Sequence, residues 1–548
     1  MTCRSFGHRA PLLWLLAPMI AGLAAGRALP ALPVAAFLAL AFLGSAVALA
    51  CCVRRVRFAG WAASLVLAVF CASLASYTLH RRRVERWAAY PSREVLVEVR
   101  IDRMFASSDP RKSSGLGLIR ASPRAELIDQ TVYFSLGLRR NERAPARGSV
   151  VRLRALMSPV PANPGAATFD GYLAAAGINF KLLRGRAQAV VVPQGPYHAF
   201  CDAAAARFRA ILDRGIDAKR PDLAALLRGM MLGQTSDLSE DQRTVFRQSG
   251  TMHLFAISGL NIGVIAVALE ALLLLTRLPL AARFVLGLAL LWLFVDITGA
   301  SPSAVRAFGM AAFVHLARLC RRPNTPLAAI VGSATFVVAM APFQLFSASF
   351  IMSYGIVIAI LTLGAPLAEH CLAWWSPWHL VPRVTWARWQ EWTVWVWRWL
   401  VQSVAVGIAA AVVGTLTGIL FFELVTPASL AANLALIPAA VAATTGGFVS
   451  LLCGLLGFEA GSIHCNHAAA LVLWGIEALA RWSLTWPGAF FDAFFQPGWI
   501  GPAALLAMMV VLLAGYAARW ERKVGGWAAP FVLLAVTLTA GVTYGVGG

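Results

Sequence analysis

The sequence predicts a polytopic α-helical membrane protein with a small β domain inserted between its membrane segments. Three observations lead to this fold class. Of the 548 residues, 59% are hydrophobic and 13% are charged, and the mean hydropathy is +0.70, a balance that ordinary soluble domains do not have. Several apolar runs reach the roughly 20 residues that a helix needs to cross ~30 Å of hydrocarbon. Between the first three runs and the others lies a long polar stretch, residues 80–192.

The N-terminal part contains three candidate spans, at residues 11–29, 31–52 and 58–79. The first is long and is followed at once by the second, so we expect a retained span rather than a cleaved signal. Arginines precede the first span and lie between the second and third. Short basic loops stay in the cytoplasm, which predicts a cytoplasmic N-terminus and an extracytoplasmic polar stretch.

Residues 93–192 differ from the rest of the chain in their pattern. Apolar and polar residues alternate with period two in runs such as 95–101 and 150–156, which is typical of strands. Glycines at 115–117 and the segment 163–165 indicate turns. The alternation predicts a small barrel or sandwich and does not choose between them. The stretch contains no cysteine, so no disulfide can stabilise it.

Basic residues predominate, and the formal net charge is +22. Residues 81–186 contain 20 Lys plus Arg against 9 Asp plus Glu, an excess of 20 − 9 = 11, which suits a domain that follows a phosphate backbone. Nearly all the basic residues are arginine. Arginine is suited to bidentate phosphate recognition, but the same bias arises in a GC-rich genome, and the two explanations stay open.

The remainder of the chain is mainly membrane-embedded. After a less hydrophobic helical region at 219–250, we expect spans at 254–276, 284–298, 303–319, 326–341, 349–363, 401–421, 428–443, 445–456, 468–484, 503–517 and 527–546. Residues 369–400 are rich in tryptophan with interleaved arginines. Such a basic and aromatic amphipathic segment predicts a helix at the membrane surface.

The first polar segment within the membrane block is residues 250–263. It places His253, Ser258 and Asn261, together with Gly259 and Gly263, at the start of an apolar span. Polar groups in lipid need partners or water, so the segment indicates a polar conduit. Small residues also allow helices to approach closely, and helix packing is the alternative explanation.

The second polar segment is residues 298–307. Ser301 and Ser303 lie in a break between spans, and Arg306 lies just inside the next helix. An arginine there costs about 2.5–3.5 kcal/mol on insertion scales unless it is paired or reaches the interface. It either forms a structural ion pair with Asp296 or contacts phosphate in a lumen.

These segments resemble motifs of the ComEC family of competence DNA-uptake channels. Residues 253–263, HLFAISGLNIG, resemble its HLLAISGLH signature, and residues 298–307 resemble its TGASPSxxRA element. Further resemblances, in family order, are at 229–247, at 350–354 (the FQLSF element), at 432–438 (aNLLAIP), and at 163–165 with 169–173, the end of the OB-like domain. The matches extend over most of the chain.

The resemblance implies a bacterial inner-membrane channel that passes single-stranded DNA into the cytoplasm during natural transformation. It also implies that the extracytoplasmic β domain is a small OB-like barrel that binds DNA. The implied channel-lining residues are His253, Ser258, Gly259, Asn261, Gly263, Ser301, Ser303, Arg306, Ser353 and Asn433, and the implied DNA-binding residues of the β domain are Arg100, Arg103, Arg139, Arg140, Arg152 and Arg154. The aromatic residues Phe105, Tyr133, Phe134 and Tyr172 either stack on bases or fill the core.

The implied domains are N-terminal transmembrane helices (1–80), the OB-like domain (81–195), linking amphipathic helices (196–250), the competence-type channel domain (251–520) and a C-terminal transmembrane helix (521–548). Single-stranded DNA and membrane lipid are the expected partners, together with a separate nuclease, DNA receptor and cytoplasmic motor, and the channel could form a homo-oligomer.

The sequence departs from the family pattern in three ways. Asn261 stands where the family has histidine, and Ile351 and Met352 replace glutamine and leucine. Full-length members also carry a C-terminal metallo-β-lactamase-like domain, whereas this sequence ends in an apolar run.

We expect no catalytic residue, metal or cofactor. No His-x-His-x-Asp-His run is present, although a hydrolase of the metallo-β-lactamase class needs such a cluster. No phosphate-binding P-loop is present either. The dense group at residues 464–467, His-Cys-Asn-His, is a metal site or simply a helix start, and we favour the latter.

Two other functions stay open. The same polar residues would suit a transporter or flippase of another anionic solute or lipid. A membrane hydrolase with His253 as base and Ser258 as nucleophile is less favoured, because no acidic residue is identifiable to orient the histidine.

Overall fold

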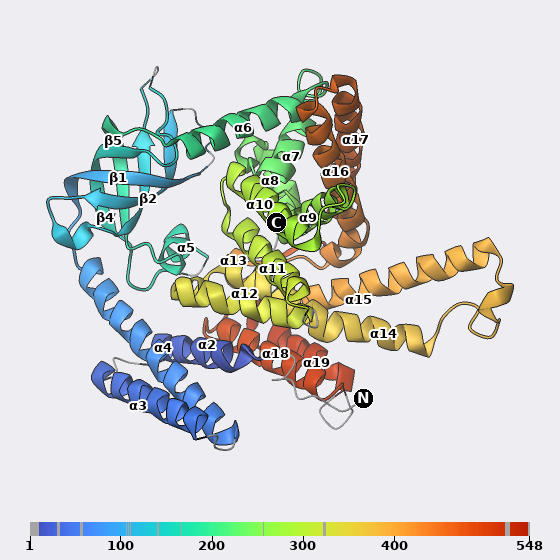
Figure 1. The fold of residues 1–548 in the computed structure, drawn as a ribbon, viewed down its shortest axis with the longest axis horizontal. Helices are drawn as coiled ribbons and strands as arrows, with labels where there is room; N and C mark the ends of the chain where they lie inside the picture. Colours follow the sequence, from blue (N-terminus) through green and yellow to red (C-terminus); the bar gives the residue numbers. More distant parts are fainter. Residues whose placement is uncertain are drawn as a thin grey trace. The chain divides into compact units, whose positions relative to one another are not determined.

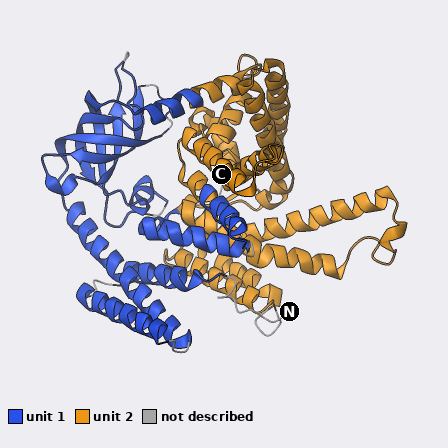
Figure 2. Cartoon of the chain, viewed as in Figure 1, with its two compact units in different colours: residues 1–204, 308–347 blue, residues 205–307, 348–548 orange. Residues whose placement is uncertain are grey.

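The computed structural model describes residues 10–29, 33–54, 58–105, 107, 109, 111–139, 142–165, 167–255, 257–321, 325–520 and 526–545. The chain divides into two compact units, coloured separately in Figure 2. Unit 1 comprises residues 1–204 and 308–347, and unit 2 comprises residues 205–307 and 348–548. Each is described by itself below.

Unit 1 begins with three helices, α2 (Leu13–Ala28), α3 (Val34–Val53) and α4 (Phe58–Ala88). Both α2 and α3 pack against α4. Glycine permits the close approach of α2, because a Cβ at Gly22 would lie 2.4 Å from the Phe70 carbonyl oxygen, as is usual for small residues between membrane helices. The three predicted spans are therefore helices, but α4 continues to Ala88 and leads directly into the first strand.

The β domain of unit 1 is a closed barrel of five strands: β1 (Arg93–Phe105), β2 (Lys112–Ala121), β3 (Thr131–Gly137), β4 (Val150–Pro159) and β5 (Phe180–Val192). The strand order is β1-β2-β3-β5-β4, and Figure 1 shows the barrel with four of these strands labelled. All pairs are antiparallel except β3 with β5. A short helix, α5 (Phe169–Ala175), precedes β5 and is capped by Thr168. The alternation in the sequence left barrel and sandwich open, and the closed pairing confirms the OB-like barrel.

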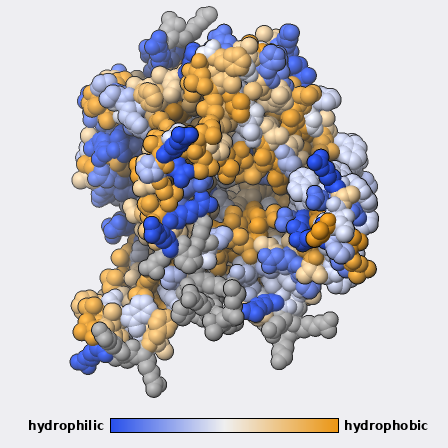
Figure 3. Space-filling model, turned by 45° about the vertical axis from the view of Figure 1, so that its right-hand side comes forward, coloured by the Kyte–Doolittle hydropathy of each residue, from blue (hydrophilic) through white to orange (hydrophobic). Residues whose placement is uncertain are grey.

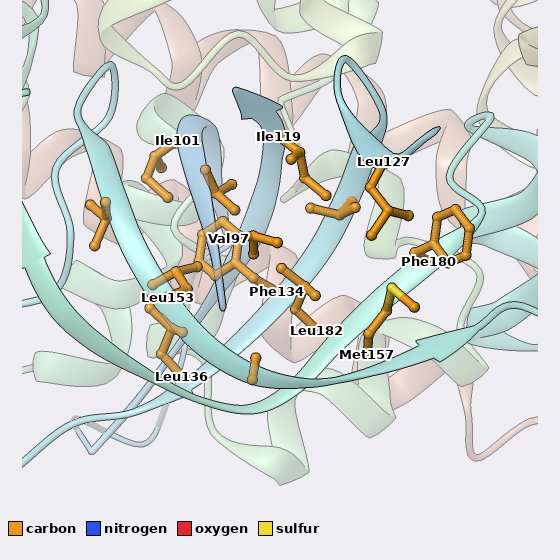
Figure 4. Close-up of a cluster of buried hydrophobic side chains, with 14 residues drawn as sticks. Val97, Ile101, Ile119, Leu127, Phe134, Leu136, Leu153, Met157, Phe180 and Leu182 are labelled. Atoms are coloured by element: carbon orange, nitrogen blue, oxygen red, sulfur yellow. The ribbon is translucent and has the colours of Figure 1, made fainter. Parts of the chain in front are cut away.

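Alternate residues of each strand fill the barrel (Figure 4). On β1, for example, Val97, Val99 and Ile101 are fully buried and their neighbours face outward. The turn predicted at 115–117 is wrong, because these glycines lie within β2. A Cβ at Gly115 would lie 2.2 Å from the Arg103 carbonyl oxygen, so the glycines mark a close approach of β2 to β1 rather than a turn.

Unit 1 also contains α12 (Pro326–Met340), which packs against α2. Helix α6 (Pro196–Asp213) leads from unit 1 into unit 2, and α11 (Pro302–Leu319) leads from unit 2 into unit 1.

Unit 2 is almost entirely helical. Its elements are α7 (Pro221–Leu232), α8 (Glu240–Gln248), α9 (Gly259–Leu274), α10 (Leu280–Ile297), α13 (Ala348–Ala359), α14 (Ala365–Trp374), α15 (Arg388–Phe422), α16 (Ala428–Leu455), α17 (Glu459–Ser483), α18 (Ile500–Ala517) and α19 (Ala529–Ala540). Over the described ranges, eight helical segments of the chain are long and apolar enough to cross a membrane. Apolar side chains also make up much of the surface in Figure 3. The fold is thus that of a polytopic membrane protein with a small barrel domain.

Several predicted boundaries in unit 2 are wrong. The spans expected at 428–443 and 445–456 form one helix, α16, which contains Pro438. Within the segment 196–250, α7 is buried from Leu223 to Leu232. The C-terminal helix α19 is only 12 residues long, since the chain leaves it for β8 (Val542–Tyr544), which pairs with β7 (Phe491–Phe495).

The tryptophan-rich segment does not form a separate surface helix. It is divided between the end of α14 and the start of α15, which is continuous for 35 residues. The two helices lie side by side (Figure 1), and Trp375 contacts Trp397 with ring centroids 4.7 Å apart. A 35-residue helix is about 52 Å long, which exceeds the ~30 Å hydrocarbon thickness. The helix is therefore longer than the hydrocarbon layer is thick. Its first turns carry the exposed side chains of Trp389, Trp392 and Trp395.

Candidate functional site

The first polar segment forms a turn and a helix cap. Helix α9 starts at Gly259, and the hydroxyl of Ser258 accepts a hydrogen bond from the Asn261 backbone N–H at 3.3 Å. His253 lies in the preceding 3-10 turn, where its exposed ring places Nδ1 3.0 Å from the Gly250 carbonyl oxygen. The side chains of His253 and Ser258 therefore contact different backbone groups, an arrangement that does not favour a base and nucleophile pair.

The second polar segment joins the start of α11 to the start of α9. Ser301 caps α11, since its hydroxyl accepts from the Ala304 backbone N–H. The Ser303 hydroxyl donates to the Ile257 carbonyl oxygen at 2.6 Å. Ile257 directly precedes Ser258, so the N-termini of the two helices lie next to each other.

Arg306 connects this pair of helices to α13. Its side chain is nearly fully buried, with 2% exposed. Nη2 donates to the carbonyl oxygen of Ser349 at 2.9 Å, to the hydroxyl of Ser349, and to the hydroxyl of Ser353 at 3.0 Å. These partners replace the pair with Asp296 that the sequence left open. Nε and Nη1 of the guanidinium are buried and have no hydrogen-bond partner among the residues that the structure describes.

Three motifs separated by more than 40 residues thus meet in one place. We call this group the serine–arginine junction: Ser258, Ser301, Ser303, Arg306, Ser349 and Ser353. Its members come from the starts of α9, α11 and α13. Of the predicted channel-lining residues, the junction includes five, and it adds Ser349, which the sequence did not single out.

Asn261 lies apart from the junction and is satisfied within the protein. Its Nδ2 donates to the Met230 carbonyl oxygen at 3.1 Å, and its Oδ1 accepts from the Thr444 hydroxyl at 3.4 Å. Only 2% of the residue is exposed. The amide therefore ties α9 to the end of α7 and to α16, which agrees with the packing explanation for this residue.

Replacing Asn261 with leucine is expected to destabilise the protein by about 1–3 kcal/mol, because the Met230 carbonyl and the Thr444 hydroxyl lose a buried partner. The melting temperature of the purified full chain in detergent would measure this. Serine at the exposed position Gly263, where an added Cβ has open space, is the matched control. An unchanged melting temperature in the leucine variant would show that the amide does not hold these helices together.

The other predicted channel residues are more scattered. A Cβ at Gly259 would lie 3.8 Å from the Ala307 Cβ, so this glycine faces α11. Asn433 lies on α16, and its buried Oδ1 has no hydrogen-bond partner in the described part of the chain. None of the described hydrogen bonds connects Asn433 to the serine–arginine junction.

Three of the predicted arginines of the barrel are already paired with carboxylates. Arg100 contacts Asp102 at 2.8 Å, Arg152 contacts Glu98 at 2.7 Å and Arg154 contacts Glu94 at 2.7 Å. The hydrogen bond and charge of Arg154 lower the pKa of the Glu94 carboxyl. The pairs of Arg152 and Arg154 connect β4 to β1, whereas Arg100 and Asp102 both lie on β1. Each pair contributes little net charge. Arg139 follows β3, where its backbone N–H donates to Glu142, and Arg140 lies outside the described residues.

The remaining arginine of that set, Arg103, lies within an aromatic cluster on the outside of the barrel. Its guanidinium is 5.4 Å from the ring centroid of Phe105. Burial lowers the pKa of Arg103, and a hydrogen bond with Tyr172 opposes this shift. Arg103 is thus held between rings rather than by a carboxylate.

The rings of this cluster form a continuous chain. Tyr133 lies 6.1 Å from Phe105 in a stacked arrangement and 5.0 Å from Phe169 edge-on, and Phe169 stacks on Tyr172 at 6.0 Å. Phe169 is 50% exposed and Tyr172 is 37% exposed. We call these four aromatic residues, together with Arg103, the aromatic patch. Phe134, by contrast, is fully buried in the barrel core. The sequence analysis named Tyr172 as a stacking residue but not Phe169, which lies in the same helix, α5.

Residues 464–467 bind the end of α6 rather than forming a cluster of ligands. Nδ2 of Asn466 donates to the carbonyl oxygens of Ile211 at 2.8 Å and Arg214 at 3.0 Å. The His467 ring lies 3.0 Å from the Gly215 carbonyl oxygen. The described part of the chain contains no group of three or more His, Cys, Asp or Glu placed to hold a metal.

The fold is that of a polytopic membrane protein. Its apolar helices include a buried polar group, the serine–arginine junction. The Competence protein family matches residues 230–522, which is more than half of the chain and includes all of the serine–arginine junction. The chain belongs to this family, of the ComEC type, as its motifs predicted.

The chain is also similar to ComE operon protein 3 of Bacillus subtilis (strain 168), with 26% identity over 141 residues. This match covers 26% of the chain and 18% of that protein, so it spans less than a fifth of the relative's length. No solved structure matches the chain.

Proposed function

We propose that the protein is an inner-membrane channel that passes single-stranded DNA into the cytoplasm during natural transformation. In this proposal the N-terminus is cytoplasmic, the barrel is extracytoplasmic, and residues 251–520 form the passage. Membership of the competence family supports a role in DNA uptake. The chain acts as a conduit rather than an enzyme, and separate proteins supply the nuclease, the receptor and the motor.

The aromatic patch on the barrel is the observation that carries the proposal. A DNA strand offers two chemical features, phosphates and unstacked bases, and proteins that bind single strands combine cationic groups with exposed rings. The patch has both, since half-exposed Phe169 and Tyr172 lie beside the cationic Arg103. A transporter or flippase of another small anion or lipid headgroup would have no use for stacking rings, so the patch favours a strand over this alternative.

Base-dependent binding tests the proposal. We expect the full chain in detergent to bind fluorescent (dT)15 at least tenfold more tightly than an abasic 15-mer of the same charge, because stacking contributes about 1–3 kcal/mol per base. The double variant Phe169→Ala, Tyr172→Ala should lose most of this difference. Fluorescence anisotropy at fixed salt measures both affinities.

The variant Tyr197→Ala is the control, since this exposed ring lies at the start of α6. It should bind (dT)15 as tightly as the native protein does. Equal affinity of the native chain for (dT)15 and the abasic strand would contradict base recognition by the patch. In cells, deletion of the gene should abolish uptake of labelled DNA, and unchanged uptake would contradict the channel role.

A further inference from the structure

We propose that the serine–arginine junction is an oxyanion site that binds one phosphodiester group of the passing strand. The inference deepens the proposed function and rests on it for the identity of the ligand. The presence of an oxyanion site itself follows from the charges and contacts of the junction.

Helix starts supply the first part of the argument. An α-helix carries a partial charge of roughly +0.5 at its N-terminus, where backbone N–H groups lack partners within the helix, and anions bind there readily. The hydrogen bond from Ser303 to Ile257 holds the starts of α9 and α11 together. The hydrogen bonds of Arg306 to Ser349 reach the first turn of α13. The starts of α9 and α11 therefore lie next to each other, and Arg306 of α11 reaches the first turn of α13.

The arginine supplies the second part. A buried cation is unfavourable unless it is paired or fully hydrogen-bonded. Among the described residues, the hydrogen-bond partners of Arg306 are oxygens of Ser349 and Ser353, and no carboxylate is among them. Nε and Nη1 are both buried and without a partner. The guanidinium thus has two unused donors and an uncompensated charge in a region that is already positive.

A phosphate group would supply both a hydrogen-bond acceptor and a negative charge. One of its oxygens accepts a charge-assisted hydrogen bond from Nε or Nη1, and its charge offsets that of the cation. The hydroxyls of Ser301 and Ser303, which are 3.2 Å apart, are neutral and would add no repulsion. The shared chemistry is a phosphodiester, which either a DNA strand or a lipid headgroup can supply, and we assign it to the strand.

The test uses a variant that keeps the structural contacts but removes the charge. Arg306→Gln retains an amide that can donate to Ser349 or Ser353. Arg220→Gln is the matched control, because Arg220 pairs with Asp222 on the surface of the same unit. The melting temperature of the full chain in detergent is measured in sodium phosphate and in sodium chloride of equal ionic strength, with dTpdT, and with glycerophosphoglycerol as the headgroup probe.

Phosphate and dTpdT should raise the melting temperature of the native chain and of Arg220→Gln but not of Arg306→Gln. An equal rise in Arg306→Gln would overturn the site. A rise with glycerophosphoglycerol but none with dTpdT would assign the site to lipid and overturn the strand as its ligand. If Arg306→Gln does not fold, Arg306→Lys should show a smaller rise, because lysine has the charge without the fork, and an undiminished rise would overturn the site.

Transport of labelled single strands into vesicles provides the second readout. We expect at least a tenfold loss with Arg306→Gln and native affinity for (dT)15 at the barrel. Native transport by this variant would overturn the binding of the passing strand at the junction. If the native chain moves no strand yet shows an Arg306-dependent rise with phosphate, the channel function fails and the oxyanion site stands, so the two failures are distinguishable.

Discussion

Replacing Arg228 with methionine is expected to destabilise the protein by about 3–5 kcal/mol, the range for removing one partner of a buried ion pair. Only 7% of Arg228 is exposed. Its Nη1 lies 2.5 Å from Asp213 and 3.2 Å from Asp217, and its Nε lies 2.9 Å from Asp237. Burial lowers the pKa of Arg228, but hydrogen bonds and charges from these carboxylates outweigh it and the pKa is raised.

The stability is lost because Asp213, Asp217 and Asp237 all pair with Arg228 and would lose this shared cation. Arg209 also contacts Asp213 and Asp237 and offsets a part of this loss. The melting temperature and the denaturant midpoint of the detergent-solubilised chain measure the change.

Arg220→Met is the control for this prediction. Arg220 forms a pair with Asp222 at 2.8 Å in which both side chains are largely exposed, and such a pair contributes only about 0–1 kcal/mol. Losses of similar size in the two variants would contradict the assignment of Arg228 as the centre of a buried network.

The network also illustrates what sequence patterns cannot reveal. Asp213, Asp217 and Asp237 are spread over 25 residues on two helices and a turn, and no local spacing connects them to Arg228. The junction is a similar case. The sequence identified Arg306 as a costly residue, but its partners Ser349 and Ser353 lie 43 and 47 residues further on, and no local spacing connects them to it.

The parts of the fold that depend on a local sequence pattern, such as single strands and apolar helices, were predictable from the sequence. Period-two alternation in β1 and β4 depends on one buried face, and the strands follow it. Closure of the barrel depends on long-range pairs such as β1 with β4 and β3 with β5, which alternation does not encode. Hydropathy likewise located α16 but placed a break within it, because polar Thr444 and Thr445 interrupt the apolar run while the helix continues through them.

Neighbouring residues on β3 separate the stability of the barrel from its proposed function. Phe134→Ala is expected to destabilise the barrel by about 3–5 kcal/mol, the usual cost of removing a buried phenylalanine side chain. Phe134 is fully buried in the cluster of 14 residues in Figure 4. Tyr133 points to the opposite face, because side chains alternate along a strand, and there it contacts Phe105 and Phe169.

Tyr133→Ala should cost about 1–3 kcal/mol, because Tyr133 makes two aromatic pairs of about 0.5–1.5 kcal/mol each, and it should weaken the binding of (dT)15. Hydrogen exchange of the β1–β5 amides in the full chain measures the first effect, and anisotropy measures the second. We expect faster exchange throughout the barrel in Phe134→Ala and native exchange in Tyr133→Ala. If exchange in Tyr133→Ala were faster throughout the barrel, the aromatic patch would belong to the core, and the weaker DNA binding of this variant would reflect unfolding. If the amides stayed protected while (dT)15 binding weakened, the rings of the patch would be assigned to DNA binding.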